Sequence, residues 1–186
     1  MKNYMKAFLI LVYCGGLFAG DIGSPTYDAL KVFEPLIGEW EGNNEALGIF
    51  EGLPDQGSKK TVNRSTYRWL LDKTAVQREW ETLTSDGKTV INIGTSIFTL
   101  DPVTKNIVSS NFGYDGDVYW TGHGRATVEG KIYTYEIEEV TINGTYTDYT
   151  MQLNLEGENL MRWKIMDITQ NQKKLPDSTA RRMERK

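Results

Sequence analysis

The decapeptide FEPLIGEWEG, residues 33–42, marks the place where the sequence changes from a helical to an extended pattern. The apolar residues around its start have the spacing of one helix face: Leu30, Phe33, Leu36 and Ile37. Pro35 limits that helix to a short one within 27–37, because proline disrupts a helix interior. After Trp40 the apolar period is two, which is typical of half-buried strands. The stretch therefore predicts a short N-terminal helix followed by an all-β domain.

Extended segments with turn residues between them continue to the end of the chain. They span 38–43, 60–71, 75–84, 88–100, 107–114, 118–121, 124–128, 131–142, 146–155 and 160–168, with a short last strand at 180–184. Asp-Gly at 115–116 and Asn-Gly at 143–144 accept the positive φ of tight hairpin turns. No helix-length pattern interrupts the series, which excludes a parallel sheet. We therefore predict a single antiparallel up-and-down β-barrel of about ten strands, because closing the meander removes its edges.

Length and charge limit the function classes. The 186 residues suit one domain. The net charge is −4, and an acidic domain repels phosphate backbones, so nucleic acid is not an expected partner. The sequence leaves the oligomeric state open.

The N-terminus has the pattern of an export signal. Lys2 and Lys6 precede an apolar run at 7–13, which is far shorter than a membrane span. We interpret 1–19 as a signal peptide, 20–26 as a tether and 27–186 as the barrel domain, periplasmic or secreted. The sole cysteine, Cys14, follows Tyr13, where a lipobox would have a small residue. Lipid anchoring through Cys14 and free secretion both stay open, and neither permits a disulfide.

The segment 42–57 is too long for a hairpin turn between the first two strands. It contains Ile49, Phe50 and Leu53 among glycines. A segment of this length is either a lid over the barrel mouth or disordered, and the three apolar residues favour the lid.

Gly38-Glu39-Trp40 at the start of the first strand resembles the GxW opening of the lipocalin and fatty-acid-binding (calycin) barrels. In those families the tryptophan plugs the closed end, and a basic residue near the last strand stacks on it. The resemblance implies the same roles for Gly38 and Trp40 here. Three arginines lie in the corresponding region, and we favour Arg182 over Arg181 and Arg185.

The chain also resembles bacterial lipocalin-like domains of uncharacterised function and, more distantly, the nitrobindin haem barrels. The matching motifs are 33–42, DGKT at 86–89, DPVTK at 101–105 and LPD at 175–177. Nitrobindins bind haem through a histidine late in the chain, whereas the sole histidine here is His123, in mid-chain. No cofactor is therefore predicted.

No catalytic or metal-binding constellation stands out. His123 lies between two glycines, where we expect a bend, and one histidine without cysteines cannot form the usual zinc set. The acidic pairs Glu79/Glu81 and Glu136/Glu138, with Glu139 opposite the latter, fit solvated strand faces. We interpret 115–117 in the same way.

The interior face carries the functional prediction. Period-two parity places Arg78 beside Trp80 and points both inward, although one bulge would reverse this. A mixed aromatic and polar lining is typical of small-molecule pockets. The predicted ligand-binding residues are Tyr67, Trp69, Arg78, Trp80, Trp120, Tyr133 and Tyr135. We expect an exported barrel that binds a small apolar or amphipathic molecule. The alternatives are an interaction module with a filled barrel and an enzyme of unrecognised type.

Overall fold

The computed structural model describes residues 24–46, 48 and 60–186. The predicted signal peptide, Cys14 and most of the predicted lid lie outside the described residues. Within the described part of the chain, no helix is long and apolar enough to cross a membrane.

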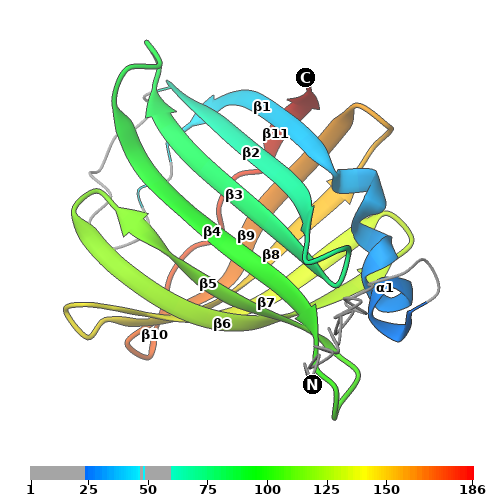
Figure 1. Cartoon of the computed structure of the whole chain (residues 1–186). Coiled ribbons are helices and arrows are strands. Elements are labelled where there is room, and N and C mark those ends of the chain that lie inside the picture. The colour runs from blue at the N-terminus through cyan, green and yellow to red at the C-terminus, as the bar shows by residue number, and fades with distance from the viewer. Residues whose placement is uncertain (1–23, 47, 49–59) are drawn as a thin grey trace, which may run out of the picture.

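The helical lead-in forms where the sequence predicts it. Helix α1 (Pro25–Leu30) is capped by Ser24, whose hydroxyl accepts the Tyr27 N–H at 3.1 Å. The chain then tightens into the 3₁₀ turn η1 (Lys31–Leu36), which contains Pro35. Three apolar side chains of this unit are fully buried: Leu30, Phe33 and Leu36. The unit packs its apolar face against one end of the barrel (Figure 1).

Antiparallel strands make up the rest of the domain (Figure 1). They are β1 (Gly38–Glu45), β2 (Lys60–Leu70), β3 (Ala75–Thr84), β4 (Val90–Leu100), β5 (Ile107–Asp115), β6 (Val118–Glu129), β7 (Ile132–Thr141), β8 (Tyr146–Leu155), β9 (Leu160–Gln170), β10 (Lys173–Lys174) and β11 (Arg181–Arg185). Consecutive strands pair from β1 to β9, and β11 lies between β9 and β1. The two-residue β10 pairs only with β9. The result is a closed barrel of ten strands, which confirms the predicted fold class.

One strand prediction was wrong. The segments 118–121 and 124–128 form the single strand β6, and its exposed His123 lies 3.5 Å from Glu138 on the outer surface. The flanking glycines do not bend the chain. A Cβ on Gly122 would lie only 2.3 Å from the Glu138 carbonyl oxygen, and one on Gly124 would meet the next strand in the same way. Glycine is needed here because β7 approaches β6 too closely for a side chain.

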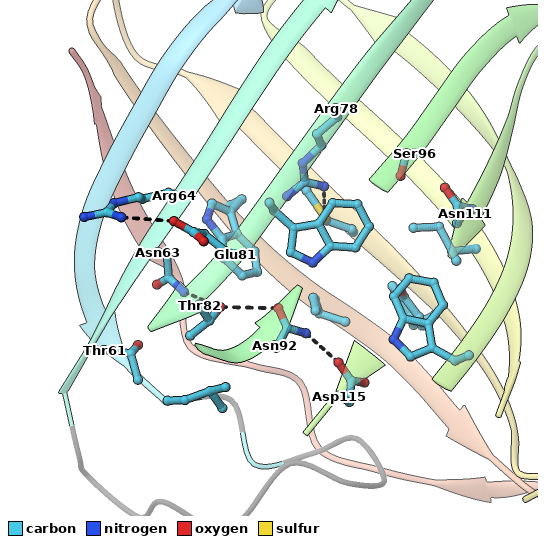
Figure 2. Close-up of a pocket in the computed structure, with 18 of the residues that line it drawn as sticks. Thr61, Asn63, Arg64, Arg78, Glu81, Thr82, Asn92, Ser96, Asn111 and Asp115 are labelled. Atoms are coloured by element: carbon cyan, nitrogen blue, oxygen red, sulfur yellow. Dashed lines mark hydrogen bonds and ion pairs between the residues drawn. The ribbon is translucent and has the colours of Figure 1, made fainter. Parts of the chain in front are cut away.

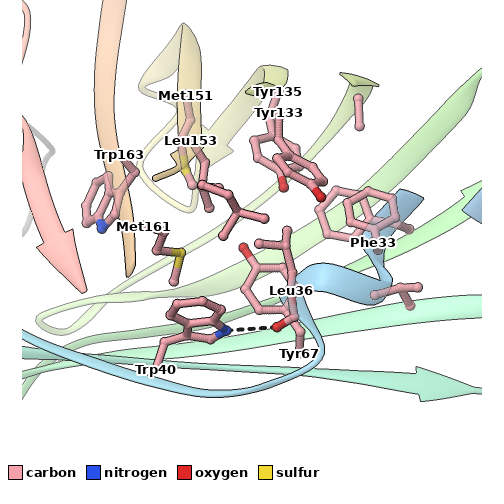
Figure 3. Packing of buried hydrophobic residues seen from close by; sticks show 14 of the residues in the cluster. Phe33, Leu36, Trp40, Tyr67, Tyr133, Tyr135, Met151, Leu153, Met161 and Trp163 are labelled. Atoms are coloured by element: carbon pink, nitrogen blue, oxygen red, sulfur yellow. Dashed lines mark hydrogen bonds between the residues drawn. The ribbon is translucent and has the colours of Figure 1, made fainter. Parts of the chain in front are cut away.

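The closed end of the barrel is built around Trp40, which is 1% exposed (Figure 3). Its indole N–H donates to the Leu36 carbonyl at 2.8 Å and so ties the first strand to η1. The Arg185 guanidinium lies 4.3 Å from the Trp40 ring centroid. Arg185 also donates to the carbonyls of Pro35 and Ile37, each at 2.6 Å.

The choice of Arg182 as the partner of Trp40 was therefore wrong, because Arg185 occupies that position. Along β11 the side chains alternate, so Arg181, Met183 and Arg185 share the inner face. Arg182 points outward, is exposed and pairs with Glu184. The inward Arg181 is buried against Trp163, with its guanidinium carbon 5.3 Å from the ring centroid.

Candidate ligand-binding cavity

A cavity of about 90 Å³ occupies the half of the barrel away from α1 (Figure 2). Its apolar lining includes Trp80, Trp120, Ile137, Met151, Trp163 and Ile165. Its polar lining includes Asn63, Arg78, Ser96, Asn111, Asp115 and Glu139. The lining also reaches Arg64 and Glu81, which are partly exposed, so the cavity communicates with solvent. This is the mixed lining that small-molecule pockets show.

Arg78 projects from β3 into the cavity, as the period-two parity predicts. Its guanidinium packs 4.9 Å from the Trp80 ring centroid, and its Nε donates to the Ser65 hydroxyl at 3.2 Å. A third contact joins Nη1 to the Met151 sulfur at 3.3 Å. None of these partners carries a charge. Within the part of the chain that the structure describes, no carboxylate forms an ion pair with Arg78.

Two tryptophans form a flat wall because two glycines leave room for them. Trp80 and Trp120 are stacked, with ring centroids 6.0 Å apart and planes 20° from parallel. Gly94 lies across from Trp80 on β4, and Gly113 lies across from Trp120 on β5. A Cβ on Gly94 would lie 2.4 Å from the Trp80 ring. Larger residues at these glycines would therefore push the rings into the cavity.

A chain of hydrogen bonds crosses the mouth of the cavity from β1 to β5. Its members are Asn44, Asn63, Thr82, Asn92 and Asp115, of which Figure 2 shows the last four. Each side chain donates to the next, so every bond points the same way. The chain ends on the Asp115 carboxyl, which accepts from the Asn92 amide at 2.5 Å. Bonds in such a series polarise one another and favour a negative charge at the final acceptor.

Among the described residues, two carboxyl groups lie inside the barrel, although the prediction was that both lie on solvated strand faces. Asp115 is 4% exposed and Glu139 is 5% exposed. Burial raises the pKa of Asp115 to about 6, against the lowering effect of Asn92 and the nearby Trp120 indole. Burial, and then the negative charge of Asp115, raise the pKa of Glu139 to about 8. The Tyr149 hydroxyl donates to Glu139 at 3.1 Å and partly opposes that shift.

Buried polar atoms without a good hydrogen-bond partner also line the cavity. They are the side-chain oxygen of Asn111 and the indole N–H groups of Trp120 and Trp163. Leaving such a group unpaired costs about 1–3 kcal/mol, so native proteins keep few of them. Water or a ligand in the cavity would satisfy all three.

The predicted ligand-binding residues separate into two groups. Arg78, Trp80 and Trp120 line the cavity. The other four belong to the packed region between the cavity and the helical unit: Tyr67, Trp69, Tyr133 and Tyr135. Tyr133 donates its hydroxyl to the Val32 carbonyl at 2.8 Å, and Trp69 packs against Tyr27 at 5.7 Å between ring centroids. These two side chains therefore hold the helical unit on the barrel, and Figure 3 shows Tyr133 beside Phe33 of that unit.

Among the described residues, no group of three or more His, Cys, Asp or Glu side chains is arranged to hold a metal ion.

Comparison with known proteins gives the fold alone. No family model matches the chain, and no curated protein matches it significantly. Among solved structures, the chain is similar to Rv2717c from M. tuberculosis, with a TM-score of 0.56 and 14% sequence identity. The match covers 85% of this chain and 97% of that chain. It therefore supports a barrel of the same general architecture, a fold compatible with ligand binding.

Proposed function

We propose that this protein is an exported, lipocalin-like barrel that binds a small amphipathic molecule in its interior. The observation that carries the proposal is Arg78, a guanidinium on the cavity wall whose partners are a hydroxyl, a thioether and aromatic rings. Arg78 is partly buried, and even a partly buried charge without a counterion is costly unless water or a ligand compensates it. An acidic or carbonyl-bearing ligand group would accept from the planar donor fork of Arg78.

The aromatic wall and the cavity size define the ligand further. Trp80 and Trp120 offer stacked, flat apolar area for a ring or a short chain. The volume of about 90 Å³ is below the roughly 150 Å³ of an engineered cavity that binds benzene. We therefore propose a ligand no larger than one ring, part of which lies in the opening. Haem and long acyl chains exceed this space.

Export and family are part of the proposal. The basic residues Lys2 and Lys6 and the apolar run 7–13 support a cleaved signal peptide, with Cys14 as the only residue for a lipid anchor. The buried Trp40 and the guanidinium of Arg185 over its ring fit what the calycin resemblance implies for the closed end. The proposed partner is therefore a small molecule met outside the cytoplasm.

The test is a tryptophan-fluorescence titration of the mature domain with 4-hydroxybenzoate, palmitate and haem. We expect binding of 4-hydroxybenzoate only, and at least tenfold weaker binding to Arg78→Met. The matched control is Arg68→Met, because Arg68 lies on the adjacent strand but pairs with Glu79 on the outer surface. Equal affinity of wild type and Arg78→Met, or no binding of any acid, would contradict the proposal. Native mass spectrometry of protein purified from its own cells would identify a copurified ligand.

One observation favours a second candidate, an enzyme that uses acid–base chemistry. Asp115 and Glu139 are buried carboxyls with pKa values raised to about 6 and about 8, and such pairs can divide acid and base roles. Recovery of the bound molecule unchanged after long incubation would support the carrier, whereas its conversion would support the enzyme. The cavity is the observation that favours ligand binding over the alternative of an interaction module with a filled barrel.

A further inference from the structure

We propose that Asp115 and Glu139 form a second, cation-selective pole of the cavity, so that the ligand carries a protonated amine as well as its acidic group. This inference rests on the proposed function, because it names the chemistry of the same cavity's ligand. It assigns one end of the ligand to Arg78 and the other end to the two carboxyls.

The strand register separates the two poles. Arg78 on β3 pairs with Ser96, Ser96 with Asn111, Asn111 with Gly122, and Gly122 with Glu139 on β7. Arg78 and Glu139 therefore lie on one row of paired residues, four strands apart in a ten-stranded barrel. Both line the same cavity, and no ion pair joins them in the described structure. A compact ligand can contact one pole with each end.

Hydrogen-bond acceptors line the cavity beyond Arg78. Asp115 and Glu139 supply carboxyl oxygens. The side-chain oxygen of Asn111, a residue only 2% exposed that lies on the row between Arg78 and Glu139, has no partner among the described residues. The Asn111 amide is already used, since it donates to Ser109 at 3.1 Å. An ammonium group brings three N–H donors and a positive charge, which is what this arrangement lacks.

The charges around the pair do not replace such a ligand. Facing the two carboxyls are the amide of Asn92 from β4, the indole of Trp120 from β6 and the hydroxyl of Tyr149 from β8. All three are neutral at physiological pH, and burial raises the pKa of the Tyr149 hydroxyl well above its usual value. The charged side chain Arg78 on β3 is bound to Ser65 and Met151.

Glu139 holds a proton at neutral pH, because its burial in the cavity wall and the negative charge of Asp115 raise its pKa to about 8. An ammonium ion would displace that proton, and the Trp120 ring at this end adds a cation–π surface. Amine binding should therefore release a proton. Its affinity should rise about tenfold between pH 6 and pH 7, because each pH unit below the pKa of the pair changes the ionised fraction about tenfold.

The experiment uses four probes of nearly one shape in isothermal titration calorimetry: 4-(aminomethyl)benzoate, 4-methylbenzoate, 4-methylbenzylamine and p-xylene. We expect 4-(aminomethyl)benzoate to bind at least tenfold tighter than 4-methylbenzoate at pH 7.5. Glu139→Gln and Asp115→Asn should each remove most of that advantage, measured as the ratio of the two affinities within the same variant. Glu138→Gln is the control, because Glu138 is adjacent in sequence but exposed on the outer surface. Circular dichroism and tryptophan emission verify that each variant folds.

The outcomes separate the two proposals. If 4-methylbenzoate binds as tightly as 4-(aminomethyl)benzoate, the cationic pole is wrong and the Arg78 site stands. If neither acid binds but 4-methylbenzylamine does, with loss in Glu139→Gln, the pole is right and the Arg78 site is wrong. If no probe binds, both proposals fail. Retention of the amine advantage in both carboxyl variants would also overturn the inference.

Discussion

Glu139→Gln should stabilise the folded protein at alkaline pH and flatten its stability profile between pH 6 and pH 8. Burial and the neighbouring Asp115 raise the pKa of Glu139 from 4.5 to about 8. The folded state therefore binds this proton more tightly than the unfolded state does. The stability that the proton contributes is complete below pH 4.5 and is lost as pH rises towards 8.

The magnitude follows from these two pKa values. Well inside the range between the unfolded pKa of 4.5 and the folded pKa of about 8, each pH unit changes the free energy of unfolding by roughly 1.4 kcal/mol. Between pH 6 and pH 8 the wild type should lose about 2 kcal/mol through Glu139, since the slope fades near the folded pKa. The pKa of Asp115 is about 6, so its titration changes the free energy of unfolding mainly below pH 6. Glutamine keeps the size of the side chain, accepts from Tyr149 and does not titrate.

The assay is urea denaturation followed by tryptophan fluorescence at pH 6, 7 and 8, for wild type, Glu139→Gln and the control Glu138→Gln. We expect the wild type and the control to lose about 2 kcal/mol across this range, and Glu139→Gln to lose under about 0.5 kcal/mol. Parallel profiles for wild type and Glu139→Gln would refute the burial of an ionisable carboxyl at this position.

Two further predictions concern packing. Arg185→Met should lower the free energy of unfolding by about 2–3 kcal/mol, because three backbone carbonyls lose a charged donor. Arg182→Met, on the outer face of the same strand, should change it by under about 0.5 kcal/mol. Chemical denaturation measures both values. Gly94→Ala should cost about 1–3 kcal/mol and alter the near-ultraviolet circular dichroism of the stacked Trp80, because its Cβ overlaps that ring. Gly157→Ala is the neutral control, since open space surrounds that position. An unchanged aromatic spectrum in Gly94→Ala would contradict the described ring packing.

Much of the fold could be predicted because alternation along a strand reports directly on which face is buried. The parity that placed Arg78 with Trp80 is correct, since β3 runs without a bulge until 82–83. The turn pairs also ended the strands where expected. The prediction of a bend at His123 was wrong because the two glycines are required by the close approach of β7. The local sequence does not show which strands come into close contact.

The acidic half of the site was missed for two different reasons. Glu139 continues the inner row of Tyr133, Tyr135 and Ile137, so the same parity would have found it had its charge not suggested a solvated face. Asp115 is the last residue of β5 and precedes a glycine, a position that normally indicates only a turn. It continues the inner row of Ser109, Asn111 and Gly113, so the alternation along β5 also predicts its inward orientation, and only the turn signal concealed it.

The position of β11 in the sheet has a consequence for how the protein folds. β11 lies between β9 and β1, and its Arg185 donates to the carbonyl of Ile37, 148 residues earlier. The barrel therefore closes only when the two ends of the domain meet, and contacts of such long range slow folding. Until β11 is in place, β1 and β9 each keep an unpaired edge that another chain could join. The same late strand thus sets both the speed of folding and the period during which the chain is open to aggregation.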